Sequence, residues 1–401
     1  MLGRTIAVVA LGLATARCSS TPPPAQGLRE VTRPWPSTIT PPLTPASPPP
    51  TQASSPRRTF TLALTGDLLI HSPVARAART DGAAPGDAYD FGPMFDEVRP
   101  ILSGADLALC HQETPISADD SDLSGYPLFN APRELAAAIA GAGYDQCSTA
   151  SNHSFDKGVS GVEATIAGLQ QAGVATVGTA RDAAGAASPP VTTVNGVRVA
   201  HLAYSYGLNG LELPADQPWL VNLIDVDRIL ADAWAARATG ARFVAVSLQW
   251  GEEYRVEPTA EQETIATQLL SSPDVDLIVG SHVHVVQPIA RVGDKYVVYG
   301  LGNFLSNQTA ACCPAASQDG VIVLVTVSDE GGVVRVTDVT YEPTWVEHPG
   351  FVVRAVATAL ADPATAAERA DLEASWQRTV AAISSLGADN EGVVPARPAP
   401  G

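Results

Sequence analysis

The sequence predicts an α/β domain built in layers, in which strands and helices alternate and a more β-rich region follows. Short apolar segments such as 59–64 and 243–248 stop abruptly at polar residues, as buried strands do where they enter functional loops. Stretches rich in Ala, Leu and Glu separate such segments, for example 132–142 and 225–238, and this composition favours helices. After His284 several apolar segments follow one another with turn residues between them, which predicts a second sheet.

The elements can be placed along the chain from these patterns. The predicted strands are 59–64, 106–109, 144–148, 243–248 and 277–279, followed by 295–299, 320–327 and 332–341. The predicted helices are 132–142, 161–172, 225–238 and 259–270, with a last helical stretch over 355–386 that breaks near Asp362-Pro363. Loops at one edge of such a sheet gather a site, so polar residues far apart in the sequence can converge there.

The start of the chain has the pattern of an export signal over residues 1–18. A basic residue precedes the apolar stretch 6–13, and small residues follow it. Two outcomes stay open: cleavage after Ala16, which gives a secreted protein, or lipidation of Cys18, which gives a membrane anchor. Arg17 is an unusual neighbour for a lipidated cysteine. We expect an exported, extracytoplasmic protein that is either secreted or held at the cell membrane as a lipoprotein.

The composition divides the rest of the chain. Residues 19–58 are dominated by Pro, Ser and Thr, which cannot build a core and favour an extended spacer. Residues 59–350 form the predicted domain, 351–390 a helical segment and 391–401 a flexible tail. The formal net charge of −18 argues against nucleic acid as a partner, because nucleic-acid binding needs basic patches.

Four cysteines lie in the body of the chain, and none has the spacing of a zinc finger. In an exported protein disulfides are allowed, so Cys110 and Cys147 are predicted to be buried, with a bridge between them left open. The adjacent pair Cys312-Cys313 is predicted to lie in a loop. Catalysis is not expected of any of the four.

Oxygen and imidazole donors follow the predicted strands. The set is Asp67, His71, Glu113, Asn152, His153, Gln249, His282 and His284. This mixture suits a pair of divalent cations, with manganese, zinc or iron favoured over calcium because imidazole is a borderline ligand. The His282-x-His284 pair would place two imidazoles on one side of an extended backbone, with Glu113 able to bridge two ions. Two such ions activate water and stabilise a leaving oxygen, so the predicted reaction is hydrolysis of a phosphate ester.

Five sequence blocks occur together in the order and spacing of a known family. They are Gly66-Asp67 with His71, SNHSFD at 151–156, WGEEY at 250–254, GSHVHVVQ at 280–287 and LGNF at 301–304. Over about residues 60–310 the chain resembles the CapA family of poly-γ-glutamate capsule-synthesis proteins. That family resembles the calcineurin-like metallophosphoesterases, which implies a four-layer α/β/β/α sandwich with two sheets between layers of helices.

The resemblance also implies roles for individual residues. One metal ion would be held by Asp67, His71 and His284, the other by Asn152, Gln249 and His282, with Glu113 as the bridge. His153 would protonate the leaving group or steady the phosphate, roles that suit an imidazole because its ordinary pKa is near neutral. The residues expected to support this set from a second layer are His111, Asp156, Glu253 and Asn303.

Three positions depart from the family pattern. Gln249 stands where the family often has histidine, Ser151 precedes Asn152 where phosphoesterases commonly have glycine, and Glu113 replaces the usual bridging aspartate. Because an amide oxygen binds zinc less well than imidazole, a site with one ion or weak activity stays open.

Two functions follow from the whole sequence. The first is an exported metal-dependent hydrolase that acts on a phosphate ester or an envelope polymer during capsule or envelope polymer synthesis. The second is a non-catalytic metal-binding subunit of a poly-γ-glutamate synthesis or export complex, with the other capsule-synthesis subunits as partners. The residues do not identify the substrate.

Overall fold

The computed structural model describes residues 57–79, 88–188 and 190–396. The predicted signal 1–18 with Cys18, and nearly all of the predicted linker 19–58, lie outside the described residues. The strands are β1 (Arg58–Leu68), β2 (Leu107–Gln112), β3 (Gln146–Ser148), β4 (Ala175–Val177), β5 (Val191–Val194), β6 (Val197–Ser205), β7 (Phe243–Gln249), β8 (Leu277–Ser281), β9 (Ile289–Val292), β10 (Lys295–Val298), β11 (Asn303–Leu305), β12 (Asp319–Glu330), β13 (Val333–Val346), β14 (Val353–Ala355) and β15 (Val394–Pro395). The α-helices are α1 (Ser72–Ala78), α2 (Arg99–Leu102), α3 (Glu134–Ala142), α4 (Gly158–Gln171), α5 (Ala183–Ala186), α6 (Val226–Ala238), α7 (Ala260–Ser271), α8 (Val356–Ala361) and α9 (Arg369–Ser384). Short 3₁₀ turns are η1 (Gly92–Phe95), η2 (Ala315–Gln318), η3 (Pro363–Thr365) and η4 (Ala388–Glu391).

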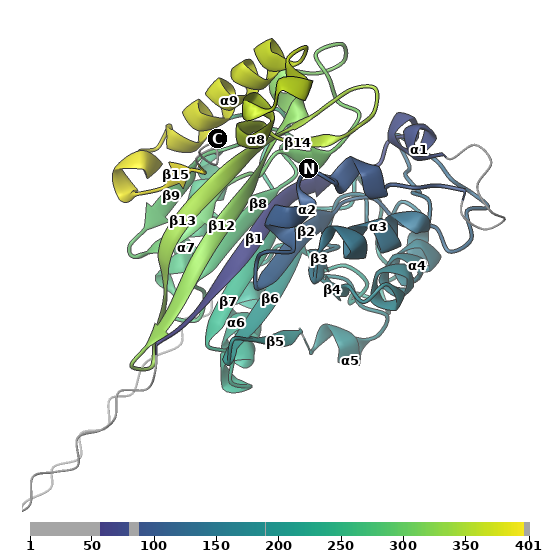
Figure 1. Cartoon of the computed structure of the whole chain (residues 1–401). Coiled ribbons are helices and arrows are strands. Elements are labelled where there is room, and N and C mark those ends of the chain that lie inside the picture. Colours follow the sequence, from purple (N-terminus) through teal and green to yellow (C-terminus); the bar gives the residue numbers. More distant parts are fainter. Residues whose placement is uncertain (1–56, 80–87, 189, 397–401) are drawn as a thin grey trace, which may run out of the picture. The chain divides into compact units, whose positions relative to one another are not determined.

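The strands of the described residues form two sheets (Figure 1). The first has the order β14-β13-β12-β1-β2-β3-β4, with β11 added beside β1 and β15 beside β13. The second has the order β5-β6-β7-β8-β10-β9. In the first sheet β1, β2, β3 and β4 run parallel, and in the second β6, β7, β8 and β10 do the same. Two sheets are therefore present, but the strands predicted after His284 do not form the second one by themselves. The predicted strands 320–327 and 332–341 join the first sheet as β12 and β13, and β5 to β8 of the second sheet all precede His284.

An apolar core lies between the two sheets because their strands alternate in side-chain direction. On β1, Phe60, Leu62 and Leu64 belong to this core, together with Phe243 of β7 and Leu277 of β8. The rings of Phe60 and Phe243 meet edge to face with centroids 5.9 Å apart. Aromatic and branched side chains thus join the inner faces of the two sheets.

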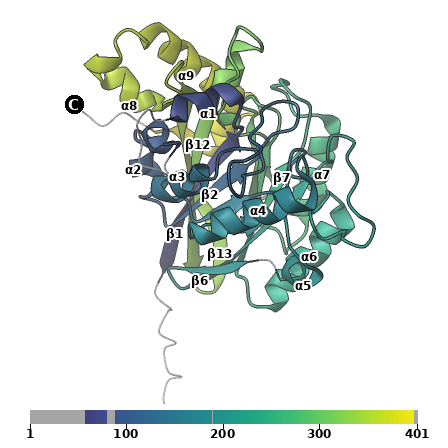
Figure 2. The ribbon, with the colours of Figure 1, turned by 90° about the vertical axis from the view of Figure 1, so that its right-hand side faces the viewer.

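Helices cover the outer faces of both sheets. The core on the outer side of the first sheet includes Leu135 and Ile139 of α3, and that of the second sheet includes Ile229 of α6 and Leu269 of α7. In the view turned by 90° (Figure 2), α3 and α4 lie in front of β2, whereas α6 and α7 lie at the right. The predicted α/β/β/α arrangement is confirmed.

The C-terminal segment joins the first sheet rather than forming helices alone. Within the predicted helical segment 351–390, β14 pairs with β13 before α8 and α9 begin. Within the predicted tail 391–401, Val394–Pro395 pairs with β13 as β15. Both short strands form backbone hydrogen bonds with β13 and so satisfy its polar backbone groups. Neither strand has an apolar pattern in the sequence that would have predicted it.

The parallel strands bring their carboxyl ends to one region, as expected for this class of fold. Asp67 lies at the end of β1, Glu113 directly follows β2, and Gln249 ends β7. None of the helices in the described ranges has the length and apolar character needed to cross a membrane.

Candidate metal centre

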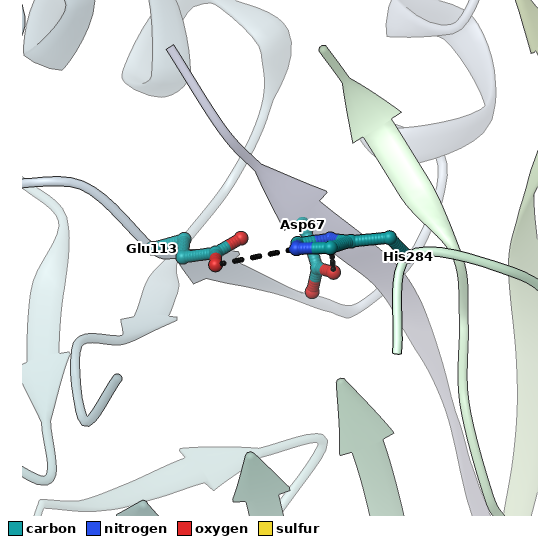
Figure 3. Close-up of side chains that lie close together, drawn as sticks. All are labelled: Asp67, Glu113 and His284. Atoms are coloured by element: carbon teal, nitrogen blue, oxygen red, sulfur yellow. Dashed lines mark hydrogen bonds and ion pairs between the residues drawn. The ribbon is translucent and has the colours of Figure 1, made fainter. Parts of the chain in front are cut away.

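Asp67 and His284 form the centre of a buried polar cluster at these strand ends (Figure 3). The Nδ1 atom of His284 lies 3.0 Å from Asp67 Oδ2 and 3.0 Å from Asn303 Oδ1. Because both neighbours accept hydrogen bonds, the ring carries a proton on Nδ1. In the neutral ring the other nitrogen, Nε2, then has the lone pair that binds metal ions.

Glu113 faces this nitrogen from the opposite side (Figure 3). Its Oε1 lies 3.8 Å from Nε2 of His284, and neither carboxylate oxygen has a hydrogen-bond partner among the described residues. The residue is only 1 % exposed, and a buried carboxylate without donors is costly unless a cation compensates it. One ligand atom each from Asp67, Glu113 and His284 lie within 4.8 Å of one another, which is the arrangement that a bound cation needs.

Burial and mutual charge set the protonation of this cluster. Burial raises the pKa of Glu113 well above its ordinary value. Burial also acts to raise the pKa of Asp67, but the hydrogen bond and charge of His284 outweigh it, and the net direction is downward. For His284 burial acts downward, and the carboxylates of Glu113 and Asp67 outweigh it and raise the pKa to about 9. A divalent cation would keep Glu113 ionised and displace a proton from the imidazole.

A glycine beside Asp67 allows two backbone segments to approach closely. The N–H of Asp67 donates to the carbonyl oxygen of Gly302 at 3.0 Å, which ties β1 to the segment before β11. A Cβ atom at Gly66 would lie 1.8 Å from the same oxygen. Only glycine therefore fits at position 66.

The segment from His282 to His284 is a strained turn. Both residues have positive φ angles, 95° and 58°, which residues other than glycine rarely adopt. The N–H of His282 donates to the Asp67 carboxylate, with 3.3 Å to each oxygen, and this contact helps to hold the turn. The extended backbone expected for this pair is therefore wrong, because the Asp67 contact replaces it with a turn that leaves the two ring centroids 6.0 Å apart.

Asn152, Gln249 and His282 form a second buried cluster, and hydrogen bonds join its members. The Nε2 of Gln249 donates to Asn152 Oδ1 at 2.7 Å and to His282 Nδ1 at 2.9 Å. The Oε1 of Gln249 lies 2.8 Å from the Ser205 hydroxyl. Burial, and then the charge of His284, lowers the pKa of His282 to about 3, so this imidazole is neutral. To ligate an ion through its oxygen, the Gln249 amide has to turn over.

His153 and Asp156 make a hydrogen-bonded pair next to these clusters. The Nδ1 of His153 lies 2.8 Å from Asp156 Oδ2, which also accepts the N–H of Phe129 at 2.7 Å. The ring of Phe129 packs edge-on against His153, with centroids 4.7 Å apart. These contacts fix the ring with Nδ1 toward the carboxylate, so that Nε2 is the nitrogen left for other partners.

His71 and His111 lie beside the first cluster without belonging to its group of three. His71 donates from Nδ1 to the carbonyl of Leu69 at 3.2 Å, and His111 Nδ1 lies 3.3 Å from the Ser148 hydroxyl. Burial lowers the pKa of both imidazoles to about 4, and neutral imidazoles are able to bind metal ions. His111 Nε2 has no hydrogen-bond partner among the described residues.

The two remaining predicted neighbours differ in position. Asn303 touches the first cluster directly through His284. Glu253 is exposed, and no hydrogen bond joins its side chain to the cluster within the described parts of the chain. Its negative charge nevertheless contributes to raising the pKa of Glu113 and the pKa of His284.

Two residues that support Asn303, and one that lies beside His282, were not predicted from the sequence. Asn303 Nδ2 donates to Gln308 Oε1 at 3.0 Å, and Gln308 Nε2 donates to the Tyr254 hydroxyl at 3.1 Å. The ring of Tyr206, 48 % exposed, lies 4.5 Å from the His282 ring. Tyr254 ends the WGEEY block, but nothing in the sequence connects it with Gln308.

Fold and site together define a class: a two-sheet α/β protein with a candidate metal centre of carboxylate, imidazole and amide groups at its strand ends. The model of the family described as bacterial capsule synthesis protein PGA_cap matches residues 61–308. This chain belongs to that family, and the predicted membership is confirmed.

Curated relatives carry related names. The capsule biosynthesis protein CapA of Bacillus anthracis is 27 % identical over 259 residues, which cover 62 % of this chain and 60 % of that protein. The PGA biosynthesis protein CapA of Bacillus subtilis is 25 % identical over 257 residues, covering 61 % and 62 %. A probable polyglutamine synthesis accessory protein of Mycobacterium tuberculosis is 25 % identical over 249 residues, covering 58 % and 64 %. The chain thus spans somewhat over half the length of these relatives.

Solved structures show a more distant similarity. The NAD nucleotidase of Haemophilus influenzae aligns with a TM-score of 0.46 and 11 % identity, over 86 % of this chain and 65 % of that one. A calcineurin-like phosphoesterase of Bacillus subtilis aligns with a TM-score of 0.43 and 13 % identity, over 81 % and 97 %.

Proposed function

We propose that this chain is a metal-dependent hydrolase with phosphoesterase-type chemistry that serves the synthesis of a capsule or cell-envelope polymer. The observation that carries the proposal is Glu113, a buried carboxylate without a hydrogen-bond partner in the described residues. Its Oε1 lies 3.8 Å from Nε2 of His284. Buried charges in proteins are paired or coordinate metals, and the donor set here suits a cation.

Two ions are proposed, with manganese, zinc or iron as the candidates. Asp67, Glu113 and His284 would hold the first, and the cluster of Asn152, Gln249 and His282 would take the second. When bound, such ions polarise a phosphoryl oxygen and lower the pKa of a water molecule. His71 is proposed to complete the first set, because burial lowers its pKa to about 4 and so keeps its imidazole neutral and able to bind a metal ion.

The chain's own residues prepare the site for this chemistry. Asn303 accepts the Nδ1 proton of His284 and so keeps Nε2 directed at Glu113. Asp156 accepts the Nδ1 proton of His153 in the same way. Nε2 of His153 can then hold a proton for the leaving oxygen. Burial of the cluster keeps bulk water from competing with these contacts.

The link to an envelope polymer is supported by the relatives, whose names refer to capsule, PGA or polyglutamine synthesis. By their names they assist synthesis of a polymer, and a hydrolase of this kind would act on that polymer or on a phosphate ester formed with it. Other subunits of a capsule-synthesis complex are the proposed partners.

The test is hydrolysis of a generic phosphate ester by the full chain, with manganese or zinc added after removal of bound metal. A His284→Ala variant is expected to lose activity, whereas His348→Ala, a half-buried histidine outside the clusters, is expected to keep it. Turnover that survives His284→Ala, or no turnover with either ion, would contradict the proposal.

A second candidate function is a metal-binding subunit without catalysis. The hydrogen bonds that join Gln249 to Asn152 and His282 favour this second candidate, because a second ion has to break them before it can bind. Tight binding of one ion, with no hydrolysis of phosphate esters, would support this candidate over the first.

We also propose that the chain is exported and processed at residues 1–18, with Cys18 as a lipidation site. This proposal rests on the sequence pattern alone. The mass of the N-terminal peptide from cells tests it: a peptide that starts at Arg17 indicates cleavage, lipid on Cys18 indicates an anchor, and an intact Met1 contradicts both.

A further inference from the structure

Two adjacent thiols lie in the loop between β11 and η2. The Sγ atoms of Cys312 and Cys313 are 2.7 Å apart, and both cysteines are free. Cys312 is exposed and Cys313 is partly buried, so an external reagent reaches Cys312 first. The other described cysteines, Cys110 and Cys147, form a buried disulfide between the paired strands β2 and β3.

A continuous chain of contacts connects this pair with the proposed metal centre. The Tyr254 hydroxyl lies 3.9 Å from Cys313 Sγ and accepts a hydrogen bond from Gln308. Gln308 in turn accepts from Asn303, and Asn303 accepts the Nδ1 proton of His284. Four contacts thus separate the thiol pair from a residue proposed to bind metal.

The backbone of the loop provides a second connection. The carbonyl oxygen of Thr309 accepts the N–H of Cys312 at 3.0 Å and that of Cys313 at 2.9 Å. Gln308 immediately precedes Thr309, so the turn that presents the two cysteines also places Gln308. A change in the Cys312–Cys313 peptide unit therefore acts on Gln308 through the chain as well as through Tyr254.

Adjacent cysteines form disulfides that are easily reduced. Neighbouring Cα atoms are about 3.8 Å apart, which is shorter than the range of about 4.4–6.8 Å that an ordinary disulfide spans. The resulting strain, and the exposure of Cys312, are the properties of labile, regulatory disulfides rather than structural ones.

We propose that Cys312 and Cys313 are a reversible redox-modification site that controls how His284 is held at the metal centre. The inference rests on the proposed function in that it assigns a regulation to the same site. Its oxidant is an external disulfide, either of low molecular weight or on a partner protein.

The exchange takes place in two steps. The thiolate of Cys312 attacks one sulfur of the external disulfide, whose S–S bond breaks to give a mixed disulfide and one free thiol. The Cys313 thiolate then attacks Cys312 Sγ, which closes the Cys312–Cys313 bond and releases the second thiol. Two electrons and two protons pass from the pair to the external disulfide. Closure of the ring moves Cys313 away from Tyr254 and loosens the support of Asn303.

The experiment uses the full chain in metal-free form, treated with oxidised glutathione and then with a mild thiol reductant. Peptide mass spectrometry locates the disulfide, and NMR of ¹⁵N-labelled histidine, with the His284→Gln variant for assignment, reports on the His284 ring. The affinity for manganese is measured on the same samples by competition with a chelator. A Cys312→Ser/Cys313→Ser double variant is the control for effects through Cys110–Cys147 or Cys18.

The expected result is a Cys312–Cys313 disulfide, a shift of the His284 ring signals that reductant reverses, and an affinity about tenfold weaker in the oxidised form. The double variant is expected to show none of these changes. Failure of the two cysteines to bridge, or a bridge that leaves the His284 signals unchanged, would overturn the inference. Because the ring signals are read without metal or substrate, absence of hydrolysis would count against the proposed function and leave this result standing.

Discussion

The side-chain amide of Gln249 donates a hydrogen bond of 2.7 Å to Oδ1 of Asn152 and so connects the two sheets at their carboxyl ends. Gln249 ends β7 of the second sheet, and Asn152 lies in the loop after β3 of the first. The Gln249 and Asn152 side chains, both proposed as ligands of the second ion, are therefore already hydrogen-bonded to each other. We therefore expect the second ion to bind more weakly than the first.

Replacing Gln249 by histidine tests this expectation. Imidazole is the stronger donor to zinc, and the substitution removes the amide that holds Asn152. Titration of metal-free Gln249→His with zinc should show the weaker binding event tightened by about tenfold, with the tighter event unchanged. If the variant binds its second ion no more tightly than the wild type, Gln249 is not at a metal position.

His153 is expected to act on the leaving group rather than on the metal. In His153→Ala, hydrolysis of an alkyl phosphate, which needs a proton on its leaving oxygen, should fall by about 10²-fold or more. Hydrolysis of p-nitrophenyl phosphate, which leaves without help, should fall much less, and metal affinity should not change. An equal loss for both esters would show that His153 has another role.

Asn303 is expected to control metal affinity without contacting the ion. It accepts the Nδ1 proton of His284 at 3.0 Å, so Asn303→Ala removes one of the two acceptors that orient the ring and leaves only Asp67. We expect an affinity for manganese about tenfold weaker, measured by chelator competition. The exposed Asn390→Ala serves as the matched control and should bind like the wild type. Equal affinities in the two variants would show that Asn303 does not control metal binding.

Glu342 gives the fold a pH dependence that is separate from the metal site. Burial raises its pKa from 4.5 to about 7, and its Oε1 accepts the N–H of Ala357 at 2.7 Å. Between these pH values the folded chain binds more protons than the unfolded chain, so this group's contribution to stability falls as pH rises from about 4.5 to about 7. The fall amounts to at most about 3 kcal/mol.

Glu342→Gln keeps the acceptor and removes the charge, which makes it a direct probe of this effect. Urea unfolding at pH 5 and pH 8 should show a larger loss of unfolding free energy for the wild type than for the variant. The same pH dependence in both proteins would assign the loss to other groups.

Much of the site could be predicted because buried parallel strands end in a common region, so that polar residues after each strand mark it. Asp67, Glu113 and His284 were found in this way, and their grouping in space follows from the topology. The conformation at His282 and His284 could not be predicted, because the positive φ angles depend on a contact with Asp67, more than two hundred residues earlier in the chain.

Other contacts depend on side chains whose partners the sequence does not indicate. His71 was predicted as a ligand and His111 as a supporting residue, but the sequence does not indicate the partner of either: His71 Nδ1 bonds to the carbonyl of Leu69, and His111 Nδ1 lies 3.3 Å from the Ser148 hydroxyl. The chain from Asn303 through Gln308 to Tyr254 joins two blocks that lie about fifty residues apart, and only the folded loop brings them together.

The most direct test of the central claim is the metal content of the purified full chain, compared with that of Glu113→Gln, after both are loaded with manganese or zinc and passed over a desalting column. We predict at least one divalent ion per chain in the wild type and its loss in the variant, which keeps the size of Glu113 and removes its charge. A wild-type chain that retains neither ion, or a variant that retains as much as the wild type, would contradict the claim that Asp67, Glu113 and His284 form a metal centre.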